Sequence, residues 1–367
     1  MDRREALLRT LRREPVEETP VSLRLELWYA DSAARGALPD EVAGCSCAEI
    51  EDHLGWGRTA RLRGYATVKL PDAEVATSTE GDVQTKQWRL PGRTLTQHAR
   101  RTEEMARQGI KEHVVEYPLK EAADYEALTA AFRGAEVRLR EDAFRELDAA
   151  TGDAGLPIAI LHSCPAHKVM LEYAGYEQFY LHRADFPEAV DGLIAAIDAA
   201  YRERMWPLVA AGPAEVILHG NHFSGAVTPP PVFGRWFAPY FRDFNRLMHE
   251  SGKMVCFHGD SDMGGLLEDI LDCGFDCADC LATAPLVAET LEDYFDAWQG
   301  RVVCWGGLPG TIFDPTFPAE GFRRHVDRTL AAARGRGDFI LGASDNVMPG
   351  AQWERLLYVA RAAGTIG

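Results

Sequence analysis

The sequence predicts a (β/α)8 barrel, the TIM-barrel fold, with an antiparallel excursion in its N-terminal part. From residue 156 onward, short apolar runs alternate with longer helical stretches. Strand–helix alternation at this spacing is typical of a mostly parallel sheet. Six such units, one strand candidate before residue 30 and one from the irregular region after it make eight strands. An open doubly wound sheet is the alternative, but no Gly-x-Gly-x-x-Gly follows a strand, which disfavours its dinucleotide-binding version.

The N-terminal part of the chain holds the least regular elements. Residues 2–14 are charged and helical in pattern, which predicts a surface helix or a contact in a homodimer. The segment 21–29 alternates apolar and polar residues and is predicted to be the first strand. Residues 57–118 lack helical periodicity and contain short alternating segments, so they are predicted to form an irregular, antiparallel elaboration. A helix is predicted over 124–150.

The rest of the chain supplies the regular units. The predicted strands are 156–162, 214–219, 253–258, 275–279, 301–305 and 338–342. The predicted helices are 186–211, 232–250, 263–273, 288–298, 319–334 and 352–363. No linker or internal repeat divides the chain, so a single barrel domain over 1–367 is expected.

Composition restricts the expected partners and compartment. The 367 residues are 46% hydrophobic, which is enough for a sizeable core, and the formal net charge is −17. Nucleic acids and anionic membrane surfaces attract basic patches, so neither is an expected partner. No apolar run approaches the length of a membrane span and the first residues do not form a signal peptide, so a cytoplasmic location is expected. The eight cysteines are sparse and lie mostly in apolar runs, which indicates reduced thiols.

Histidines and carboxylates recur just after the predicted strands. The segments are His162-Ser-Cys164, His219-Gly-Asn-His222, His258-Gly-Asp260, Trp305-Gly-Gly307 and Asp345-Asn346. In a barrel these positions face one another across the end where active sites lie. Each member alone could simply cap neighbouring backbone. Their recurrence at several strand ends favours a functional site.

His258, Asp260 and Asp345 are the predicted metal ligands. His258 and Asp260 lie two residues apart, so in extended chain they point to the same side. Asp345 follows the last strand, which a closed barrel places across the mouth from 258–260. One nitrogen and two oxygen ligands suit zinc or another first-row divalent ion, which would polarise a substrate or a bound water. Without metal, the carboxylates could orient His258 as an acid or base, and His219 is a further catalytic candidate.

Six further residues are predicted to bind the substrate. They are Glu26, Trp28, Tyr29, Asn221, His222 and Phe223. The aromatic members could form the wall of a pocket for a flat or methylated ligand, although core packing also explains aromatic residues in such positions.

A cysteine motif offers a competing interpretation. Cys273, Cys277 and Cys280 have the C-x3-C-x2-C spacing of an iron–sulfur cluster that cleaves S-adenosylmethionine. Such a cluster requires a loop, whereas Cys273 falls at a predicted helix end and Cys277 in a predicted strand. Three packed thiols are therefore expected.

Several segments between residues 90 and 307 match the pattern of one family. They are Leu90-Pro-Gly-Arg-Thr-Leu95, Glu116-Tyr-Pro-Leu-Lys120, Tyr173–Phe179 with Asp185–Glu188, Pro229–Tyr240, Gly252–His258 and Val302–Gly307. Together they resemble the uroporphyrinogen decarboxylase superfamily, particularly its methyltransferase branch, which serves corrinoid proteins. The resemblance implies a (β/α)8 barrel in which His258 is a metal ligand.

The resemblance implies an enzyme that moves a methyl group from a small O- or N-methylated substrate to a corrinoid protein. In the thiol-methylating members, zinc is held by a His-x-Cys pair and a later cysteine, whereas Asp260 and Asp345 stand at those cysteine positions here. Carboxylates make a harder site, which suits polarising an oxygen or nitrogen of the donor better than activating a thiol. The chain has no Asp-x-His-x-x-Gly cobalamin signature, so the corrinoid is expected on a partner protein. A decarboxylase-like lyase and a non-catalytic binding protein on the same fold are the alternatives.

Overall fold

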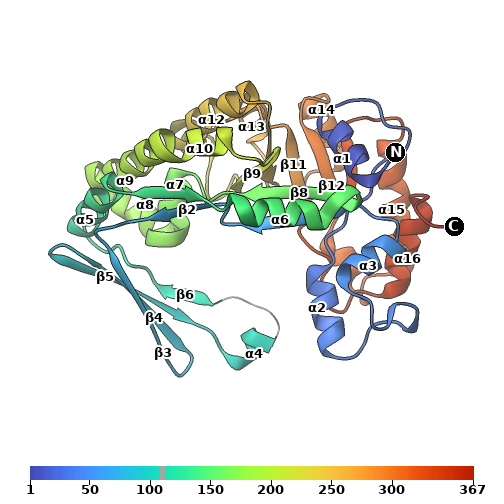
Figure 1. The fold of residues 1–367 in the computed structure, drawn as a ribbon, viewed down its shortest axis with the longest axis horizontal. Helices are drawn as coiled ribbons and strands as arrows, with labels where there is room; N and C mark the ends of the chain where they lie inside the picture. Colours follow the sequence, from blue (N-terminus) through green and yellow to red (C-terminus); the bar gives the residue numbers. More distant parts are fainter. Residues whose placement is uncertain (108–111) are drawn as a thin grey trace. The chain divides into compact units, whose positions relative to one another are not determined.

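The computed structural model describes residues 1–107 and 112–367, and the chain divides into two compact units (Figure 1). The first unit comprises residues 1–65, 141–161 and 213–367, and the second comprises 66–140 and 162–212. The single domain expected over 1–367 stays a prediction. No helix in the described part of the chain is long and apolar enough to cross a membrane.

The first unit is built on a parallel sheet of seven strands. Their order is β1 (Arg58–Arg63), β8 (Gly155–Ile160), β9 (Val216–Asn221), β10 (Met254–His258), β11 (Cys277–Leu281), β12 (Val303–Leu308) and β13 (Phe339–Ala343). The helices between and around them are α6 (Glu141–Thr151), α11 (Pro230–Val232), α12 (Ala238–Glu250), α13 (Leu267–Asp272), α14 (Leu291–Trp298), α15 (Ala319–Ala333) and α16 (Trp353–Ala362). The six strands predicted from residue 156 onward and the helices between them are confirmed, with ends shifted by a few residues. The sheet is consistent with a TIM-barrel-like fold.

The segment predicted as the first strand lies between the two edges of this sheet without being a strand. Val21 forms a single parallel bridge with Leu341 of β13. The amide of Gly57, which directly precedes β1, donates to the carbonyl of Val21 at 2.8 Å. The described residues therefore give the sheet seven strands, and this short segment contacts both edge strands.

Helix α2 (Glu26–Ala34) replaces the second half of the strand predicted over 21–29. The buried residues are Leu25, Trp28 and Ser32. They are spaced three and four apart, which is the spacing of one helix face and not of a strand. The prediction of a strand up to residue 29 is therefore wrong, because the burial period changes at Leu25.

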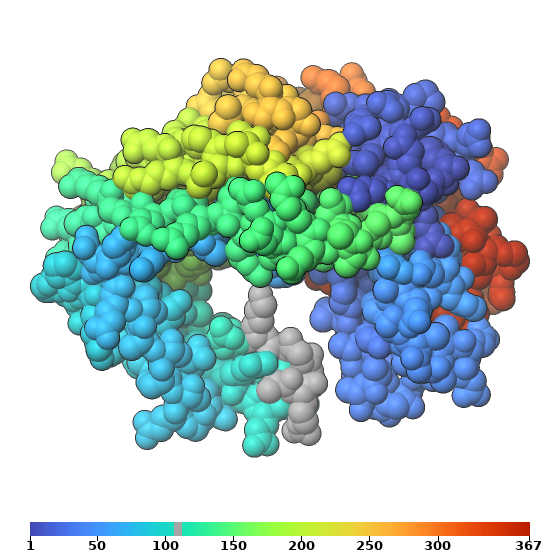
Figure 2. All heavy atoms as spheres, viewed as in Figure 1, coloured from blue at the N-terminus to red at the C-terminus, as the bar shows by residue number. Residues whose placement is uncertain are grey.

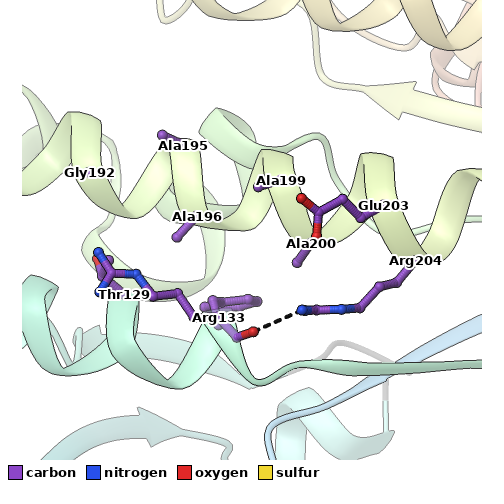
Figure 3. Close-up of a pocket in the computed structure, with 10 residues that line it drawn as sticks. Thr129, Arg133, Gly192, Ala195, Ala196, Ala199, Ala200, Glu203 and Arg204 are labelled. Carbon is purple, nitrogen blue, oxygen red and sulfur yellow. Dashed lines mark hydrogen bonds between the residues drawn. The ribbon is translucent and has the colours of Figure 1, made fainter.

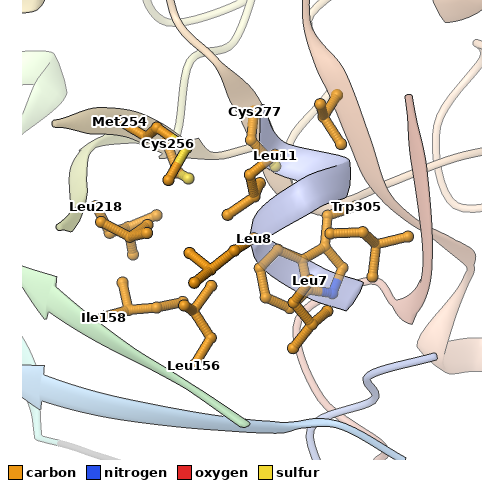
Figure 4. Packing of buried hydrophobic residues seen from close by; sticks show 13 residues of the cluster. Leu7, Leu8, Leu11, Leu156, Ile158, Leu218, Met254, Cys256, Cys277 and Trp305 are labelled. Atoms are coloured by element: carbon orange, nitrogen blue, oxygen red, sulfur yellow. The ribbon is translucent and has the colours of Figure 1, made fainter. Parts of the chain in front are cut away.

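Helix α1 (Arg3–Leu11) belongs to the core of the first unit. Its Leu7, Leu8 and Leu11 pack against side chains of the parallel strands, as Figure 4 shows. The strand residues of this cluster are Leu156, Ile158, Val216, Leu218, Met254, Cys256, Cys277, Val303, Trp305 and Ile340. The helix predicted over 2–14 is therefore confirmed as α1, but its placement on the surface is wrong, since its leucines are buried among the strands. Its role in a homodimer contact stays a prediction.

Alternation along the strands decides which side chains reach the site. Met254 and Cys256 belong to the core cluster, so His258, two residues further along β10, faces the same side. In β11, Cys277 belongs to the core cluster, so Asp279, two residues further along the strand, also faces that side.

The second unit contains two antiparallel sheets. One has the order β3 (Glu74–Glu80), β4 (Val83–Leu90), β5 (Arg93–Arg100) and β6 (His113–Glu116), and the other pairs β2 (Ala66–Lys69) with β7 (Glu136–Leu139). Its helices are α4 (Glu103–Arg107), α5 (Ala122–Arg133), α7 (Pro165–Lys168), α8 (Tyr176–Asp185), α9 (Pro187–Ala200) and α10 (Trp206–Ala211). A π-helical turn, Tyr201–Met205, joins α9 to α10, where one helix was predicted over 186–211.

Two predictions for the N-terminal part need correction. The four-stranded antiparallel sheet lies inside the predicted elaboration 57–118, but Arg58–Arg63 forms β1 of the parallel sheet instead. The helix predicted over 124–150 is two helices, because Gly134 caps α5 and β7 follows it. Residues 108–111, within the predicted elaboration, lie outside the described residues.

The C-terminal residues pack on the N-terminal part of the first unit. Figure 2 shows N-terminal atoms in blue beside C-terminal atoms in red, and the Thr365 hydroxyl donates to the Leu54 carbonyl at 2.6 Å. Leu54 directly follows α3 (Cys47–His53), which its N-terminal capping box fixes in place.

A buried carboxyl group on α3 predicts a pH dependence of stability. Glu51 is 8% exposed, and burial, assisted by the nearby Glu26, raises its pKa from 4.5 to about 8. The folded state therefore holds this proton more tightly than the unfolded state, so the free energy of unfolding falls as the pH rises through this range. In the Glu51→Gln variant this loss is absent. Its stability relative to the wild type should rise by about 3 kcal/mol between pH 5 and pH 7.5 in urea unfolding.

The exposed Glu18 provides the control for this measurement. The Glu18→Gln variant should show the same dependence of the free energy of unfolding on pH as the wild type. If the free energy of unfolding depends on pH in the same way in Glu51→Gln and in the wild type, the prediction is contradicted.

Candidate functional site

Four residues meet where β10, β11 and β13 end. His258 is the last residue of β10, Asp279 and Cys280 lie near the end of β11, and Asp345 follows β13 by two residues. Carboxyl ends of parallel strands are where ligands bind in β/α folds, so these side chains occupy the expected position.

The three residues predicted as metal ligands come together around one imidazole. Nε2 of His258 lies 3.3 Å from Oδ2 of Asp260 and 3.5 Å from Oδ1 of Asp345. The convergence of a nitrogen and two carboxylates from separate segments therefore agrees with the sequence analysis. Their role as metal ligands stays a prediction.

Cys280 is the donor that the sequence analysis missed. One ligand atom each from His258, Cys280 and Asp345 lies within 4.8 Å of the others. Bond lengths of about 2.0–2.3 Å separate tetrahedral zinc ligands by roughly 3.3–3.6 Å, so a small contraction would let these atoms share one ion. The nitrogen, sulfur and oxygen set thus fits a divalent metal. Asp260, whose Oδ2 lies 3.3 Å from the same Nε2, offers a fourth donor.

The spacing of the cysteines did mark Cys280. All three thiols of the motif are free and buried, which agrees with the expectation of packed thiols. Cys277 packs in the core cluster beside Cys256, and the thiol of Cys273 donates to the carbonyl of Asp269. Only Cys280 reaches the site, because residue 280 adopts a left-handed backbone (φ +58°) that ends the strand alternation.

Asp279 supports His258 from the side opposite the proposed ligands. Its Oδ2 lies 3.3 Å from Nδ1 of His258, and Arg61 of β1 donates to both of its oxygens at 2.8 and 2.6 Å. Asp279 is 1% exposed. Burial raises its pKa, but Arg61 and then His258 outweigh burial and hold that pKa well below its ordinary value. A histidine that gives one ring nitrogen to a carboxylate is the usual arrangement of a metal-binding imidazole.

Arg24 supports Asp345 in a similar way. The guanidinium is buried and donates to Oδ1 of Asp345 at 2.8 Å. The Asn346 amide, oriented with its nitrogen toward Glu26 (2.9 Å) and its oxygen toward Arg24 (3.0 Å), joins the same network. Arg24 and Arg61 each approach Sγ of Cys280 to 3.8 Å. These two cations would offset the negative charge of a metal-binding thiolate.

The ring of His258 is surrounded by acidic groups. Burial lowers its pKa, but Cys280 and the carboxylates of Asp260, Asp279 and Asp345 raise it more, so the pKa lies well above its ordinary value. Burial likewise raises the pKa of Asp260, and His222 and His258 lower it further than burial raises it. In the absence of a metal the imidazole is therefore protonated, and a cation at Nε2 would replace that proton.

Strained backbone is concentrated at the site. Among the described non-glycine residues with positive φ, three belong to it: His222 (+52°), Cys280 (+58°) and Asp345 (+60°). Residues with side chains avoid this region, and such strain persists only where the surroundings enforce it. Its concentration around one imidazole supports a functional site here.

His219 does not belong to the site, which corrects its prediction as a catalytic residue. Leu218 is a member of the core cluster, so His219, the next residue, points to the opposite face of β9. There its Nε2 lies 2.9 Å from the Tyr240 hydroxyl of α12, and the ring packs against Phe241 and Phe244. The side chain is 1% exposed.

Two predicted pocket aromatics are core residues. Phe223 is fully buried among Phe233, Phe241 and Phe257. Trp28 is buried, stacks on Trp353 and donates its indole N–H to the Ala351 carbonyl at 2.9 Å. Neither side chain presents a surface to a ligand, so their prediction as substrate-binding residues is wrong.

The other predicted substrate residues lie nearer to the site or remain untested. Asn221 pairs with His258 in strand register, and His222 places Nδ1 3.3 Å from Oδ1 of Asp260. Glu26 reaches the network of Arg24. Tyr29 is partly exposed on α2, and its role in binding stays a prediction.

A hollow of about 400 Å³ lies between α5 and α9 of the second unit, and Figure 3 shows it. Much of its lining is glycine and alanine, and the side chain of Arg204 donates to the Arg133 carbonyl at 2.9 Å across it. None of the predicted site residues lines this hollow, and its lining offers no group of convergent catalytic side chains.

Comparison with known proteins shows the fold of this chain, but it does not show the family to which the chain belongs. No protein-family model matches the sequence, and no curated protein matches it. Among solved structures, a methyltransferase from Methanosarcina mazei is similar, with a TM-score of 0.59 and 14% identity over 99% of this chain and 98% of that chain. At this identity the likeness shows the fold alone. The resemblance to the uroporphyrinogen decarboxylase superfamily therefore stays a prediction.

Two broad-specificity endoglucanases, from Clostridium longisporum and an uncultured bacterium, match at a TM-score of 0.34 each. Their identities are 11% and 9%, covering 63% and 68% of this chain and 78% and 86% of theirs. These scores are too low to support any conclusion.

Proposed function

We propose that this protein is a methyltransferase that moves a methyl group from a small O- or N-methylated compound to a corrinoid carried by a separate protein. The fold it shares with the methyltransferase from Methanosarcina mazei supports this proposal. The observation that carries it is the convergence of nitrogen, sulfur and oxygen donors at the strand ends. Such a set is what a site needs to hold a divalent metal beside a substrate.

His258, Cys280 and Asp345 would hold the metal, and zinc suits a mixed nitrogen, sulfur and oxygen set. When bound, such an ion supplies a Lewis acid that polarises the oxygen or nitrogen of the methyl donor. Asp260 is available as a fourth ligand or as a neighbour of the substrate, since it lies 3.3 Å from the same imidazole nitrogen.

The surrounding residues position these donors. Asp279 accepts a hydrogen bond from Nδ1 of His258 when that nitrogen is protonated, which leaves Nε2 directed at the site. Arg61 fixes Asp279 with two hydrogen bonds, and Arg24 orients Asp345. Because these groups are held before the substrate arrives, little reorganisation is needed during the reaction.

A proton is needed when the methyl group leaves. The methyl group departs as a cation equivalent toward the cob(I)alamin nucleophile, and the alkoxide, phenoxide or amide anion left behind takes up a proton to become a neutral alcohol, phenol or amine. His222 is partly exposed and contacts Asp260, so it can exchange protons with solvent beside the site.

The test is methyl transfer to free cob(I)alamin, followed by the absorbance of methylcob(III)alamin, with trimethylamine and 2-methoxyphenol as N- and O-methyl donors. We expect transfer from at least one class of donor by the metal-loaded wild type. His258→Ala should be at least about 100-fold slower, because it removes the shared donor of the site. A His258→Ala variant as active as the wild type would contradict the proposed site.

The two buried arginines favour a lyase of the decarboxylase type as the second candidate. Nε of Arg61 has no hydrogen-bond partner among residues 1–107 and 112–367, and Nε of Arg24 has only an ion pair with Glu26 at 3.6 Å. Buried guanidinium groups with unused donors are suited to a substrate that carries carboxylates. Loss of CO2 from a porphyrinogen without any corrinoid would favour this candidate over methyl transfer.

A further inference from the structure

A second group of charged and aromatic side chains lies entirely within the second unit. It surrounds a cavity of about 800 Å³, a volume typical of sites for small organic ligands. The residues that matter for its chemistry are Lys168, Glu172, His162, Lys86, Trp88 and Tyr173. His162 follows a predicted strand end in the sequence, yet the candidate metal site makes no use of it.

Lys168 is a buried cation with unused hydrogen-bond donors. It is 6% exposed, and its ammonium donates to Oε2 of Glu172 at 2.5 Å. An ammonium group has three N–H donors, and the described part of the chain offers this one no second acceptor. Burial lowers its pKa, but Tyr201, Glu172 and Tyr173 raise it above its ordinary value, so it is charged at neutral pH. A buried charge with open donors is costly, and an anion in the cavity would satisfy them.

Aromatic rings border the cavity next to this cation. Trp88 and Tyr173 meet edge to face with ring centroids 6.2 Å apart, and both are mostly buried. Lys86 places Nζ 4.6 Å from the Trp88 ring centroid, and Lys168 places Nζ 5.6 Å from that of Tyr173. Aromatic walls of this kind favour a ligand with a flat apolar body, which offers area for stacking and edge contacts.

The charge of the lining favours a single negative charge on the ligand. The lining contains three lysines, Lys69, Lys86 and Lys168, and two glutamates, Glu112 and Glu172. Burial and the neighbouring Lys168 lower the pKa of His162, so its ring is neutral at pH 7. The described residues of the lining therefore carry one net positive charge, which a carboxylate balances and a phosphate dianion exceeds.

We propose that this cavity binds a flat organic monoanion, an aromatic carboxylate, with its carboxylate on Lys168 and its ring against Trp88 and Tyr173. The proposal does not depend on the methyltransferase function or on a metal. It assigns the second unit a ligand of its own, recognised by one buried ammonium and an aromatic wall.

Benzoate is the probe, and benzyl alcohol, of similar shape but neutral, is its control. Isothermal titration with the full-length protein should detect benzoate binding, and benzoate should raise the melting temperature while benzyl alcohol should not. Lys168→Met should weaken benzoate binding at least tenfold. The matched control is Lys120→Met, which removes an exposed lysine that also pairs with a glutamate four residues away and should bind like the wild type.

Glu172→Gln tests the same idea without deleting the cation. Glu172 is partly exposed, so the variant should fold, and its lining would carry one more net positive charge. Benzoate should then bind several-fold more tightly. The proposal is overturned if the wild type binds no benzoate at millimolar concentration, if benzyl alcohol binds equally well, or if Glu172→Gln weakens binding.

Discussion

Replacing Arg61 with methionine should lower the free energy of unfolding by about 3–5 kcal/mol, the cost of leaving a buried charge without its partner. Asp279 is 1% exposed and receives two hydrogen bonds from Arg61, at 2.8 and 2.6 Å. Without the guanidinium, the buried carboxylate would lose both of these hydrogen bonds and keep His258 as its remaining charged partner. Urea unfolding of chelator-treated protein measures the loss without a contribution from bound metal.

The double variant Arg61→Met/Asp279→Leu separates the loss of a pair from the loss of one partner. It should recover part of the stability, because removing both charges of the pair leaves neither member of the pair alone. The exposed pair of Arg35 and Asp31 gives the matched control, and Arg35→Met should cost less than about 1 kcal/mol. A loss of under 1 kcal/mol for Arg61→Met would mean that Asp279 is hydrated or already neutral.

The sequence was sufficient for features that repeat locally. The strands and helices after residue 156 follow from apolar periodicity, which needs no knowledge of tertiary contacts. The approach of His258 to Asp345, from β10 and from the loop after β13, follows from one rule: side chains at the carboxyl ends of parallel strands converge. The parallel seven-stranded sheet agrees with the mostly parallel sheet that this periodicity predicts.

The sequence was not sufficient for pairs that only the fold creates. Arg61 and Asp279 are separated by 218 positions, and Arg61 fell in a region predicted to be antiparallel. Asp279 is the last residue of the predicted strand 275–279 and Cys280 directly follows it, so both already stood at a strand end. Asp279 was not selected and Cys280 was interpreted as part of a cysteine motif, because nothing in the sequence shows that Arg61 and His258 approach Asp279.

The position of each histidine along its strand separates His258 from His219. His219 and His258 both stand near strand ends, but His258 continues the inward series of Met254 and Cys256, whereas His219 follows the inward Leu218. In the structure, the position of His219 along β9 places it on the face that packs against α12. Recurrence of a residue type at strand ends is therefore weaker evidence than recurrence on one face.

Cys280→Ser should decide which residues bind metal, because the sequence favoured Asp260 as the second ligand and the structure offers Cys280. In the wild type loaded with cobalt(II), a thiolate ligand gives an intense sulfur-to-cobalt charge-transfer absorption in the near ultraviolet. Cys280→Ser should abolish this absorption, since its hydroxyl is a poor ligand and no other cysteine lies in the group of donors. Cys45→Ser, at a partly exposed cysteine of the same unit, is the control and should keep it.

The zinc affinities of variants at the other residues should show how much each residue contributes to metal binding. His258→Ala should lose stoichiometric metal, because His258 supplies the nitrogen that the other donors surround. Asp279→Asn should weaken binding by about 10–100-fold without removing a ligand, since it only orients the imidazole. If Asp260→Asn releases the metal, Cys280→Ser keeps it, and the cobalt-loaded wild type shows no thiolate absorption, the ligand set is that of the sequence analysis. The sulfur would then be a neighbour of the site and not a part of it.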